Sequence, residues 1–430
     1  MTENKKGKRK IMKAAAIIIG IAALIFSFLS GFFIRTAIVG KDAAALSEIA
    51  AYLKEYGVFD SETTELKEFS AEDAARLITE NAPDKYATYY SKEEYEAIKN
   101  NSSGKYEGVG ISVYKDTLKI ARVVINSPAF NSGIERGDIL ISATDARGNT
   151  TALNSIDDVN AFIDNLSENS FSFTVSRDGE EKTFAMKTEK YKSAYLLYKD
   201  NVSAYAYLGE YDDDLELKKT GEGIAALPEN ASYIRFDSFE GGAADELKGM
   251  LSLMKEKGKT RLILDVRGNG GGYMDVLSDF AGGIIYAEGK SNFALAYAKD
   301  SKGKFTEYNA GKNYFYSGIE KIAVIADEYS ASATECLIGA MLYYGGAFSA
   351  DRLIIENETI EGGIAKTFGK GIMQTTFMLS NGGAVKLTTA IVYQPDKITT
   401  IHGKGIAVSG INAVARSDNK ALERAVFAIS

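Results

Sequence analysis

The stretch KIAVIADEYSASATECLIGAMLYYGG, residues 321–346, decides the fold. KIAVIAD reads as a buried strand and ATECLIGAMLYYGG as a helix, and two serines, Ser330 and Ser332, lie at the junction between them. The same alternation runs through residues 191–430, where SYIRFDSF and TRLILDVRG read as strands and ADELKGMLSLMKEKG and YMDVLSDFAGGII as helices. Strands that alternate with helices pair in parallel through crossover helices. The sequence therefore predicts an α/β fold with a βαβ core over residues 191–430.

Residues 104–190, upstream of this core, have the pattern of a small β domain. GVGISVYK, ARVVIN and FSFTVSRDG are short strand patterns, and a helix is expected near IDDVNAFIDNL. The segment Gly108, Val109, Gly110 and Ile111 places two glycines at the start of a strand. Successive backbone N–H groups there can converge on an anion, and the strand edge stays open to pair with a peptide. The segment is a candidate peptide-binding loop.

Residues 42–103 are predicted to form a helical N-terminal segment. AAALSEIAAYLKEYG carries apolar residues at helical spacing, and AEDAARLITENA reads as a second, shorter helix. We expect these helices to pack on the next domain or on a second copy of the chain, which leaves a homodimer open.

Residues 1–41 predict a membrane anchor. They hold eight basic side chains and one acidic one, and the 21 residues 14–34 are uncharged. A helix of this length spans about 31 Å, the thickness of a bilayer's hydrocarbon core. The basic flank should stay in the cytoplasm and direct the rest of the chain to the outer face. The alternative is a signal peptide cleaved near Ala43 and Ala45; either way, the body is expected outside the cytoplasm.

The composition excludes several classes of function. The net charge is −8, and because the first 41 residues are basic, the remainder carries −15. An acidic body without a basic patch repels a phosphate backbone, so no nucleic-acid partner is expected. One histidine, His402, and one cysteine, Cys336, cannot supply a zinc site from neighbouring positions. No metal and no other cofactor is expected.

Two candidate features lie at strand ends, where sites in parallel sheets collect. Ser332 precedes a helix, and Ser332-x-x-Glu335 fits a helix capping box as well as a nucleophile held at a helix N-terminus. The glycine run GNGGG, residues 268–272, invites a dinucleotide-binding interpretation, but Tyr273 occupies the place of the third glycine. Such a run exposes backbone N–H groups, which an oxyanion hole requires.

A serine hydroxyl needs a base, and Lys370 is the candidate. It lies between Gly369 and Gly371; if KTFGKGIMQ is a strand, Gln374 points to the same side and can hold the amine by a hydrogen bond. Lysine has a pKa of about 10.4 in water, and burial without a carboxylate partner lowers the pKa towards neutrality. His402, in the predicted loop IHGKGI, is the alternative base.

Taken in order, these blocks resemble the C-terminal processing, or tail-specific, serine peptidases. LILDVRGNGGG, YSASATE, KTFGKGIMQ, LTTAIVYQP and IHGKGI follow one another as in that family, behind a PDZ-like segment marked by SPA, SGI and RGDI. DKYATYYSKEEYEAI is similar to the family's lead-in to its PDZ domain. The resemblance covers nearly all of the chain beyond the anchor, and it implies a ClpP/crotonase-like peptidase core behind a PDZ-like domain over residues 104–190.

The resemblance also implies a role for each candidate residue. The nucleophile of the family falls on Ser332, the general-base lysine on Lys370 and the glutamine that orients it on Gln374. The oxyanion hole falls on the backbone N–H groups of Gly271 and Ala333. The implied protein is a membrane-anchored serine endopeptidase. Its partners are exported polypeptides with free C-termini, captured on the PDZ-like domain and cleaved through an acyl-enzyme.

Several features depart from the family pattern. Residues 347–366 and 207–223 look longer than usual, and we interpret both as surface loops rather than as lids over the site. The substituted positions are Val266 for leucine, Gly270 for proline, Thr334 for serine, and Tyr343 for an aspartate that some members have. Gly270 should loosen the glycine turn, because proline would fix its φ angle.

Two other classes of function compete with the peptidase. One is a membrane-tethered PDZ adaptor whose peptidase-like domain only binds tails, although an adaptor has no need to keep Ser332, Lys370 and Gln374 together. The other is a nucleotide-binding α/β protein, which Tyr273 disfavours.

Overall fold

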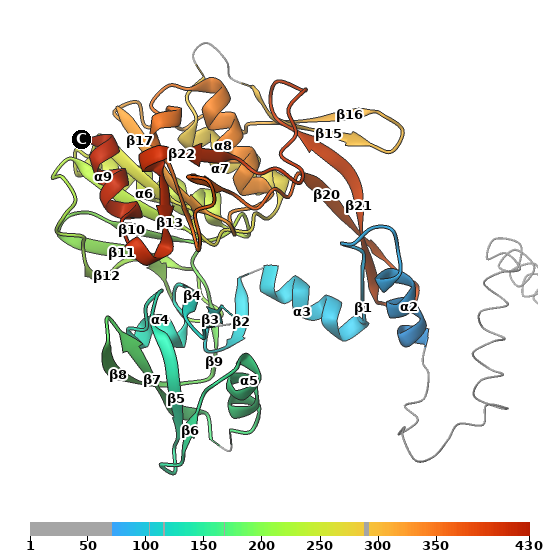
Figure 1. The fold of residues 1–430 in the computed structure, drawn as a ribbon, viewed down its shortest axis with the longest axis vertical. Coiled ribbons are helices and arrows are strands. Elements are labelled where there is room, and N and C mark those ends of the chain that lie inside the picture. Colours follow the sequence, from blue (N-terminus) through green and yellow to red (C-terminus); the bar gives the residue numbers. More distant parts are fainter. Residues whose placement is uncertain (1–70, 103, 115–116, 167, 288–291) are drawn as a thin grey trace, which may run out of the picture. The chain divides into compact units, whose positions relative to one another are not determined.

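The computed structural model describes residues 71–430, apart from 103, 115–116, 167 and 288–291 (Figure 1). The chain divides into two compact units, residues 1–89 and 90–430. In the first unit, the helix predicted from AEDAARLITENA is α2 (Ala71–Glu80). The predicted membrane span, residues 14–34, and the helix predicted from AAALSEIAAYLKEYG lie outside the described residues. Of the helices that are described, none has both the length and the apolar character to cross a membrane.

A region that we call the β region, residues 105–192, corresponds to the predicted small β domain. Its elements are β2 (Lys105–Gly108), β3 (Ile111–Val113), β4 (Ile120–Val123), α4 (Pro128–Ser132), β5 (Ile139–Asp145), β6 (Thr150–Ala152), α5 (Ile156–Asp164), β7 (Ser170–Arg177), β8 (Glu180–Lys187) and β9 (Glu189–Lys192); β1 (Thr88–Tyr90) and α3 (Lys92–Ser102) precede it. A four-stranded sheet has the order β6-β5-β7-β8, and β3-β4 and β2-β9 form separate pairs. Alternate residues of β7, Phe171, Phe173 and Val175, are buried, as the two-residue period of a strand requires.

The core of the second unit is an eight-stranded sheet in the order β12-β11-β10-β13-β14-β17-β18-β23. Its elements are β10 (Leu196–Lys199), β11 (Ser203–Leu208), β12 (Glu216–Glu222), β13 (Ala231–Phe236), α6 (Ala243–Glu256), β14 (Arg261–Asp265), α7 (Met274–Ile284), β17 (Lys321–Asp327), α8 (Ala333–Tyr344), β18 (Leu353–Asn357), β23 (Ala413–Ala415) and α9 (Ala421–Ile429). Pairing is parallel from β13 to β23, which confirms the predicted βαβ core. At the other end of the sheet, β10 pairs antiparallel with β13 and β11, and β11 pairs antiparallel with the edge strand β12.

The apolar strands of this sheet contribute side chains to a hydrophobic cluster on each of its two faces. Leu262 and Leu264 of β14 belong to the larger core cluster, which also takes in α6, α7 and α8, whereas Ile263 between them belongs to a smaller cluster with α9. Successive side chains of a strand point to opposite faces, so an unbroken apolar run is what a sheet covered on both faces needs.

The structure corrects both loop expectations. Within residues 347–366, β18 is an interior strand of the core sheet, and its residues Leu353, Ile354 and Ile355 are buried. Within residues 207–223, β11 and β12 form a hairpin that extends the sheet, and only the turn between them is irregular. Both stretches therefore build the sheet.

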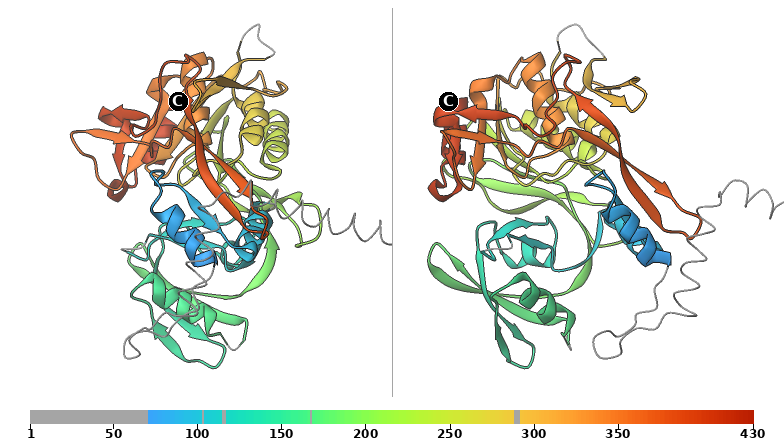
Figure 2. Two further views of the ribbon diagram at one scale, coloured as in Figure 1. Left: turned by 90° about the vertical axis from the view of Figure 1, so that its right-hand side faces the viewer. Right: turned by 45° about the vertical axis from the view of Figure 1, so that its right-hand side comes forward.

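A second, antiparallel sheet is built from strands that precede α8 and strands that follow it. Its paired strands include β15 (Ala294–Asp300), β16 (Phe305–Asn309), β20 (Ile372–Met378) and β21 (Ala384–Tyr393), and the short pair β19 (Ile364–Lys366) and β22 (Ala407–Ser409) lies nearby in the chain. Figure 2 shows the β20–β21 hairpin reaching away from the helices of the core. The candidate base, Lys370, lies just before this hairpin begins.

Candidate active site

Ser332 occupies the junction between β17 and α8, in a backbone conformation that serine rarely adopts. Its φ is 58° and its ψ is −117°. A residue other than glycine with positive φ costs about 1–3 kcal/mol, and such strain is concentrated at functional sites. Ser330 has a different role: it is fully buried, and its hydroxyl donates to the Val266 carbonyl at 2.8 Å. Of the two serines, the partly exposed Ser332 is the one available for chemistry.

Glu335, in the first turn of α8, joins the two candidate catalytic residues. Its Oε2 accepts hydrogen bonds from the backbone N–H of Ser332 at 3.0 Å and from that of Lys370 at 2.9 Å. Its Oε1 accepts from the Thr367 hydroxyl at 2.6 Å and the Gly369 N–H at 2.7 Å. One fully buried carboxylate thus brings together two residues that are far apart in the sequence.

The sequence interpretation treated Glu335 as a capping residue only. The hydrogen bond that the Glu335 carboxylate accepts from the Ser332 N–H agrees with that view, but its hydrogen bonds to residues 367–370 go beyond capping. A signal was present: Glu335 is the one charged residue in the otherwise apolar helix ATECLIGAMLYY, and a buried carboxylate needs several donors.

Lys370 lies two residues before β20, in a segment packed closely against the loop that contains His402. The Gly403 N–H donates to the Gly369 carbonyl at 2.9 Å, and a Cβ on Gly371 would lie 2.5 Å from the His402 nitrogen. Both glycines are therefore needed for the close approach of two backbones. The pKa of Lys370 is lowered, first by burial and then by the charge of Lys386, which is the direction that a general base requires.

The other two residues that the sequence proposes for base chemistry, Gln374 and His402, lie on different elements. Gln374 lies on β20, opposite Thr388 of β21. The alternative base, His402, packs by its backbone against Gly371; its Nδ1 is buried and has no hydrogen-bond partner among the described residues.

The glycine turn lies directly against the candidate nucleophile, Ser332. Gly271 has a φ of 101°, and a Cβ there would lie 2.8 Å from the Ala331 carbonyl oxygen and 2.9 Å from the Ser332 Cβ. Ala333 begins α8, so its N–H has no acceptor within the helix. The structure thus brings the two predicted oxyanion donors together. In this conformation, however, the Gly271 N–H donates to Asn269 Oδ1 at 3.0 Å.

Asn269 is a second residue that the sequence interpretation missed. It is fully buried, and its backbone carbonyl accepts from the Ala331 N–H at 3.0 Å. The Thr334 hydroxyl lies 2.9 Å from both the carbonyl and the side-chain oxygen of Asn269. Thr334, one of the departures from the family pattern, keeps a hydroxyl that ties the glycine turn to α8.

Asp327, at the end of β17, accepts hydrogen bonds from both the glycine turn and the loop that leads to Ser332. Its Oδ1 accepts from the N–H groups of Gly268 at 2.9 Å and Ser330 at 3.0 Å. Its Oδ2 pairs with Arg136 of the β region at 3.2 Å. Burial raises the pKa of Asp327, and the Arg136 charge opposes that rise. Arg136 therefore connects the β region to the loops that hold Ser332 and Gly271.

The candidate peptide-binding loop joins β2 to β3. The Val109 carbonyl accepts from the Ala129 N–H at 3.0 Å, and the Gly110 carbonyl accepts from the Val124 N–H at 2.8 Å. In a trans peptide the N–H points away from the carbonyl of the same plane, so the N–H groups of Gly110 and Ile111 point away from Ala129 and Val124. Among the described strands, β3 pairs with β4 alone, which leaves its other edge open.

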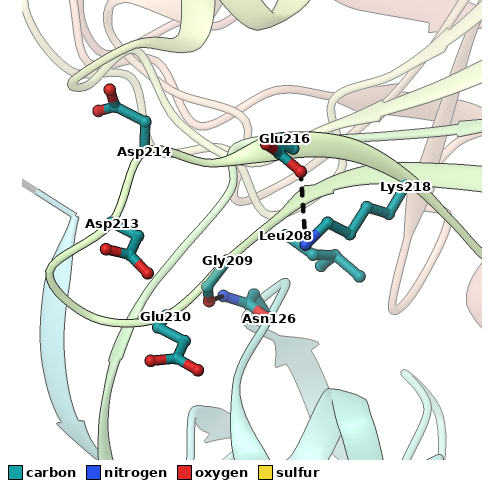
Figure 3. A pocket seen from close by; sticks show the side chains of 8 residues that line it. All are labelled: Asn126, Leu208, Gly209, Glu210, Asp213, Asp214, Glu216 and Lys218. Atoms are coloured by element: carbon teal, nitrogen blue, oxygen red, sulfur yellow. Dashed lines mark hydrogen bonds and ion pairs between the residues drawn. The ribbon is translucent and has the colours of Figure 1, made fainter.

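A separate hollow of about 570 Å³ lies by the turn between β11 and β12 (Figure 3). Four carboxylates line it, together with Asn126 of the β region and Lys218, which pairs with Glu216. The carboxylates belong to Glu210, Asp213, Asp214 and Glu216. None of the candidate catalytic residues borders this hollow, so it is not the active site.

The fold and this arrangement together define an α/β protein with the features of a serine peptidase. Residues 230–408 match the model of Peptidase family S41, and this segment contains Gly271, Ser332, Lys370 and Gln374. This part of the chain is accordingly similar to Peptidase family S41.

The chain is also similar to individual proteins. A "probable CtpA-like serine protease" of Staphylococcus aureus (strain bovine RF122 / ET3-1) is 27% identical over 325 residues, which cover 75% of this chain and 56% of the relative. The protein of the same name from Staphylococcus epidermidis (strain ATCC 12228 / FDA PCI 1200) gives the same values. The chain thus matches little more than half the length of these relatives. The solved structure of the photosystem II D1 C-terminal processing protease is 21% identical, covers 85% of this chain and 84% of its own, and has a TM-score of 0.47.

Proposed function

We propose that the protein is a membrane-anchored, extracytoplasmic serine endopeptidase of the C-terminal processing type. The observation that carries this proposal is a pair of hydrogen bonds to Glu335. One carboxylate oxygen of Glu335 accepts from the backbone N–H of the candidate nucleophile, Ser332, and from that of the candidate base, Lys370. Lys370 is the residue whose lowered pKa fits it for that role. A PDZ adaptor gains nothing from such an arrangement.

The reaction follows from these roles. The Lys370 amine takes the proton of the Ser332 hydroxyl as Oγ bonds to the carbonyl carbon of the scissile peptide. The tetrahedral intermediate collapses as the C–N bond breaks and Lys370 returns the proton to the leaving amine, which leaves an acyl-enzyme on Ser332. Water then attacks the ester, Lys370 takes its proton, and the acid product leaves as Ser332 regains a hydrogen. Gln374 is assigned the orientation of the Lys370 amine.

The oxyanion of the intermediate is assigned to the N–H groups of Gly271 and Ala333. The Gly271 N–H donates to Asn269 Oδ1, so binding of the oxyanion exchanges that hydrogen bond for one to the substrate oxygen.

Substrate selection is assigned to the β region acting as a PDZ domain. The N–H groups of Gly110 and Ile111 suit a C-terminal carboxylate, and the open edge of β3 suits an added peptide strand. Residues 1–41 supply the anchor and the orientation, which makes exported polypeptides the substrate class.

The test compares the full chain, purified in detergent, with Ser332→Ala and Lys370→Ala on an unfolded reporter with an apolar C-terminus. We expect cleavage by the wild type, loss of cleavage in both variants, and wild-type activity that falls as the pH becomes acidic. Tail binding without cleavage by the wild type would favour the adaptor. Equal cleavage of reporters with free and amidated C-termini would remove the PDZ assignment while leaving the peptidase.

A further inference from the structure

The segment that leads from β19 to the candidate base, Lys370, alternates between buried and exposed side chains. Ala365 and Thr367 are buried, whereas Ile364 is 50% exposed and Phe368 is 54% exposed. Alternation with a period of two is the pattern of an extended chain that is covered on one face only. Phe368 therefore lies on the open face of this segment.

The covered side of the segment is held on helix α8. The Thr367 hydroxyl and the Gly369 N–H both donate to Glu335 Oε1, at 2.6 Å and 2.7 Å. The backbone is also packed closely at Gly369, where a Cβ would lie 2.9 Å from the Gly405 nitrogen. Both neighbours of Phe368 are thus fixed, so its ring is carried by a rigid backbone.

The backbone of Phe368 lies beside the loop of the candidate nucleophile. Its N–H donates to the Ser330 carbonyl at 3.1 Å. Two residues further along each segment, the N–H groups of Ser332 and Lys370 share Glu335 Oε2. The two segments therefore run side by side. A strand rises by about 3.3 Å per residue, which places Phe368 within about 7 Å of Lys370 along its segment, the length of two residues of an extended substrate.

The Phe368 ring is open to a ligand at this point. The loop before Ser332 has an exposed ring of its own, that of Tyr329, but it is engaged with other groups: its centroid lies 5.3 Å from that of Tyr114 and 5.8 Å from Arg416 Cζ. Among the described residues, Phe368 has no such ring contact. A fixed aromatic ring offers a large apolar contact area at a small cost in conformational entropy.

We propose that Phe368 determines the specificity of the peptidase: its ring contacts a substrate side chain next to the scissile bond, and the enzyme prefers polypeptides with an apolar side chain there. This selection is additional to the capture of a C-terminal tail. The inference rests on the proposed function, since a cleavage preference exists only if Ser332 and Lys370 cleave.

The test maps, by mass spectrometry, the bonds that the full chain cleaves in an unfolded reporter, for wild type, Phe368→Ala and the control Phe427→Ala. Phe427 is also an exposed phenylalanine, but it lies on α9. Peptides with leucine or glycine on either side of the mapped bond then give kcat/KM. On one side of the bond, wild type and F427A should prefer leucine by about 10-fold or more, and F368A by no more than about 3-fold. An unchanged ratio in F368A, or an equal loss for both peptides, would overturn the proposal.

A second readout does not depend on cleavage. Two peptides with the same apolar C-terminus, one rich in leucine and one rich in glycine and serine upstream of it, are titrated against the Ser332→Ala chain with and without Phe368→Ala. Fluorescence anisotropy should show that F368A weakens binding of the leucine-rich peptide several-fold and leaves the other unchanged; equal effects on the two peptides would overturn the proposal. If the wild type cleaves nothing but this difference remains, the proposed function fails while the contact between Phe368 and an apolar polypeptide stands.

Discussion

At the scale of single residues, the site depends on backbone conformations that side chains would not permit. Ser332 is strained and lies against Gly271, where a Cβ would come within 2.9 Å of the Ser332 Cβ. A Cβ does not come this close to a heavy atom to which it is not bonded, so a side chain at Gly271 must displace either the glycine turn or the candidate nucleophile, Ser332.

We therefore predict that Gly271→Ala lowers kcat/KM by at least about 100-fold, in the range for loss of an oxyanion donor. The matched control is Gly270→Ala, because no atom lies within 4 Å of a Cβ there and its φ is not in the left-handed region. G270A should keep activity within a few-fold of wild type, as measured with the reporter peptide. Equal losses in the two variants would contradict this account of the turn.

At the scale of elements, Glu335 is the link between α8 and the segment that leads into β20. All four of its hydrogen bonds come from N–H or O–H donors, two on each oxygen. A glutamine there replaces one carboxylate oxygen by an NH₂ group. That group is itself a donor, so it cannot accept hydrogen bonds from the two donors that it faces. Removal of a partner from a buried polar group costs about 1–3 kcal/mol.

Glu335→Gln should therefore lower the thermal midpoint and also reduce kcat more than it raises KM, because Ser332 and Lys370 lose their common anchor. Thr367→Val, which removes one of the four donors, should lower kcat and the thermal midpoint by less. Thr367→Ser keeps the hydroxyl and should keep both close to the wild-type values. Steady-state kinetics and thermal melts of the three variants check this ordering. A Glu335→Gln enzyme with normal kcat at a temperature where it is folded would show that Glu335 serves stability alone.

The elements of the core were predictable, and their long-range contacts were not. KIAVIAD and TRLILDVRG are unbroken apolar runs, which a strand covered on both faces requires, and both are strands. LIIEN in β18 is also apolar, but it was assigned to a loop because it lay in a stretch longer than the family pattern. Residues 207–223 are polar because their hairpin lies at the sheet edge. Ser332 and Lys370 were found by motif, whereas the roles of Glu335, Asn269 and Asp327 arise from contacts between distant segments.

At the scale of the whole molecule, one buried carboxylate makes stability depend on pH. Glu246 of α6 is buried in the core, and its Oε2 accepts from the N–H groups of Tyr195 at 2.9 Å and Leu196 at 3.0 Å. Burial raises the pKa of Glu246 from 4.5 to about 8, although these two hydrogen bonds oppose the rise. The folded state thus favours the neutral acid. The contribution of Glu246 to stability is greatest below pH 4.5 and declines as the pH rises towards about 8.

Glu246→Gln should remove this decline, because the amide is neutral at every pH and its oxygen can take the place of Oε2. The free energy of unfolding of E246Q, relative to wild type, should therefore rise between pH 5 and pH 8 by on the order of a few kcal/mol. Glu256→Gln is the matched control, since Glu256 is exposed on the same helix. Denaturant unfolding of the three proteins at pH 5, 6.5 and 8 measures the differences. Wild type and E256Q should lose stability in parallel while E246Q does not; three parallel curves would mean that Glu246 is already ionised in the folded protein and is stabilised by its two backbone donors.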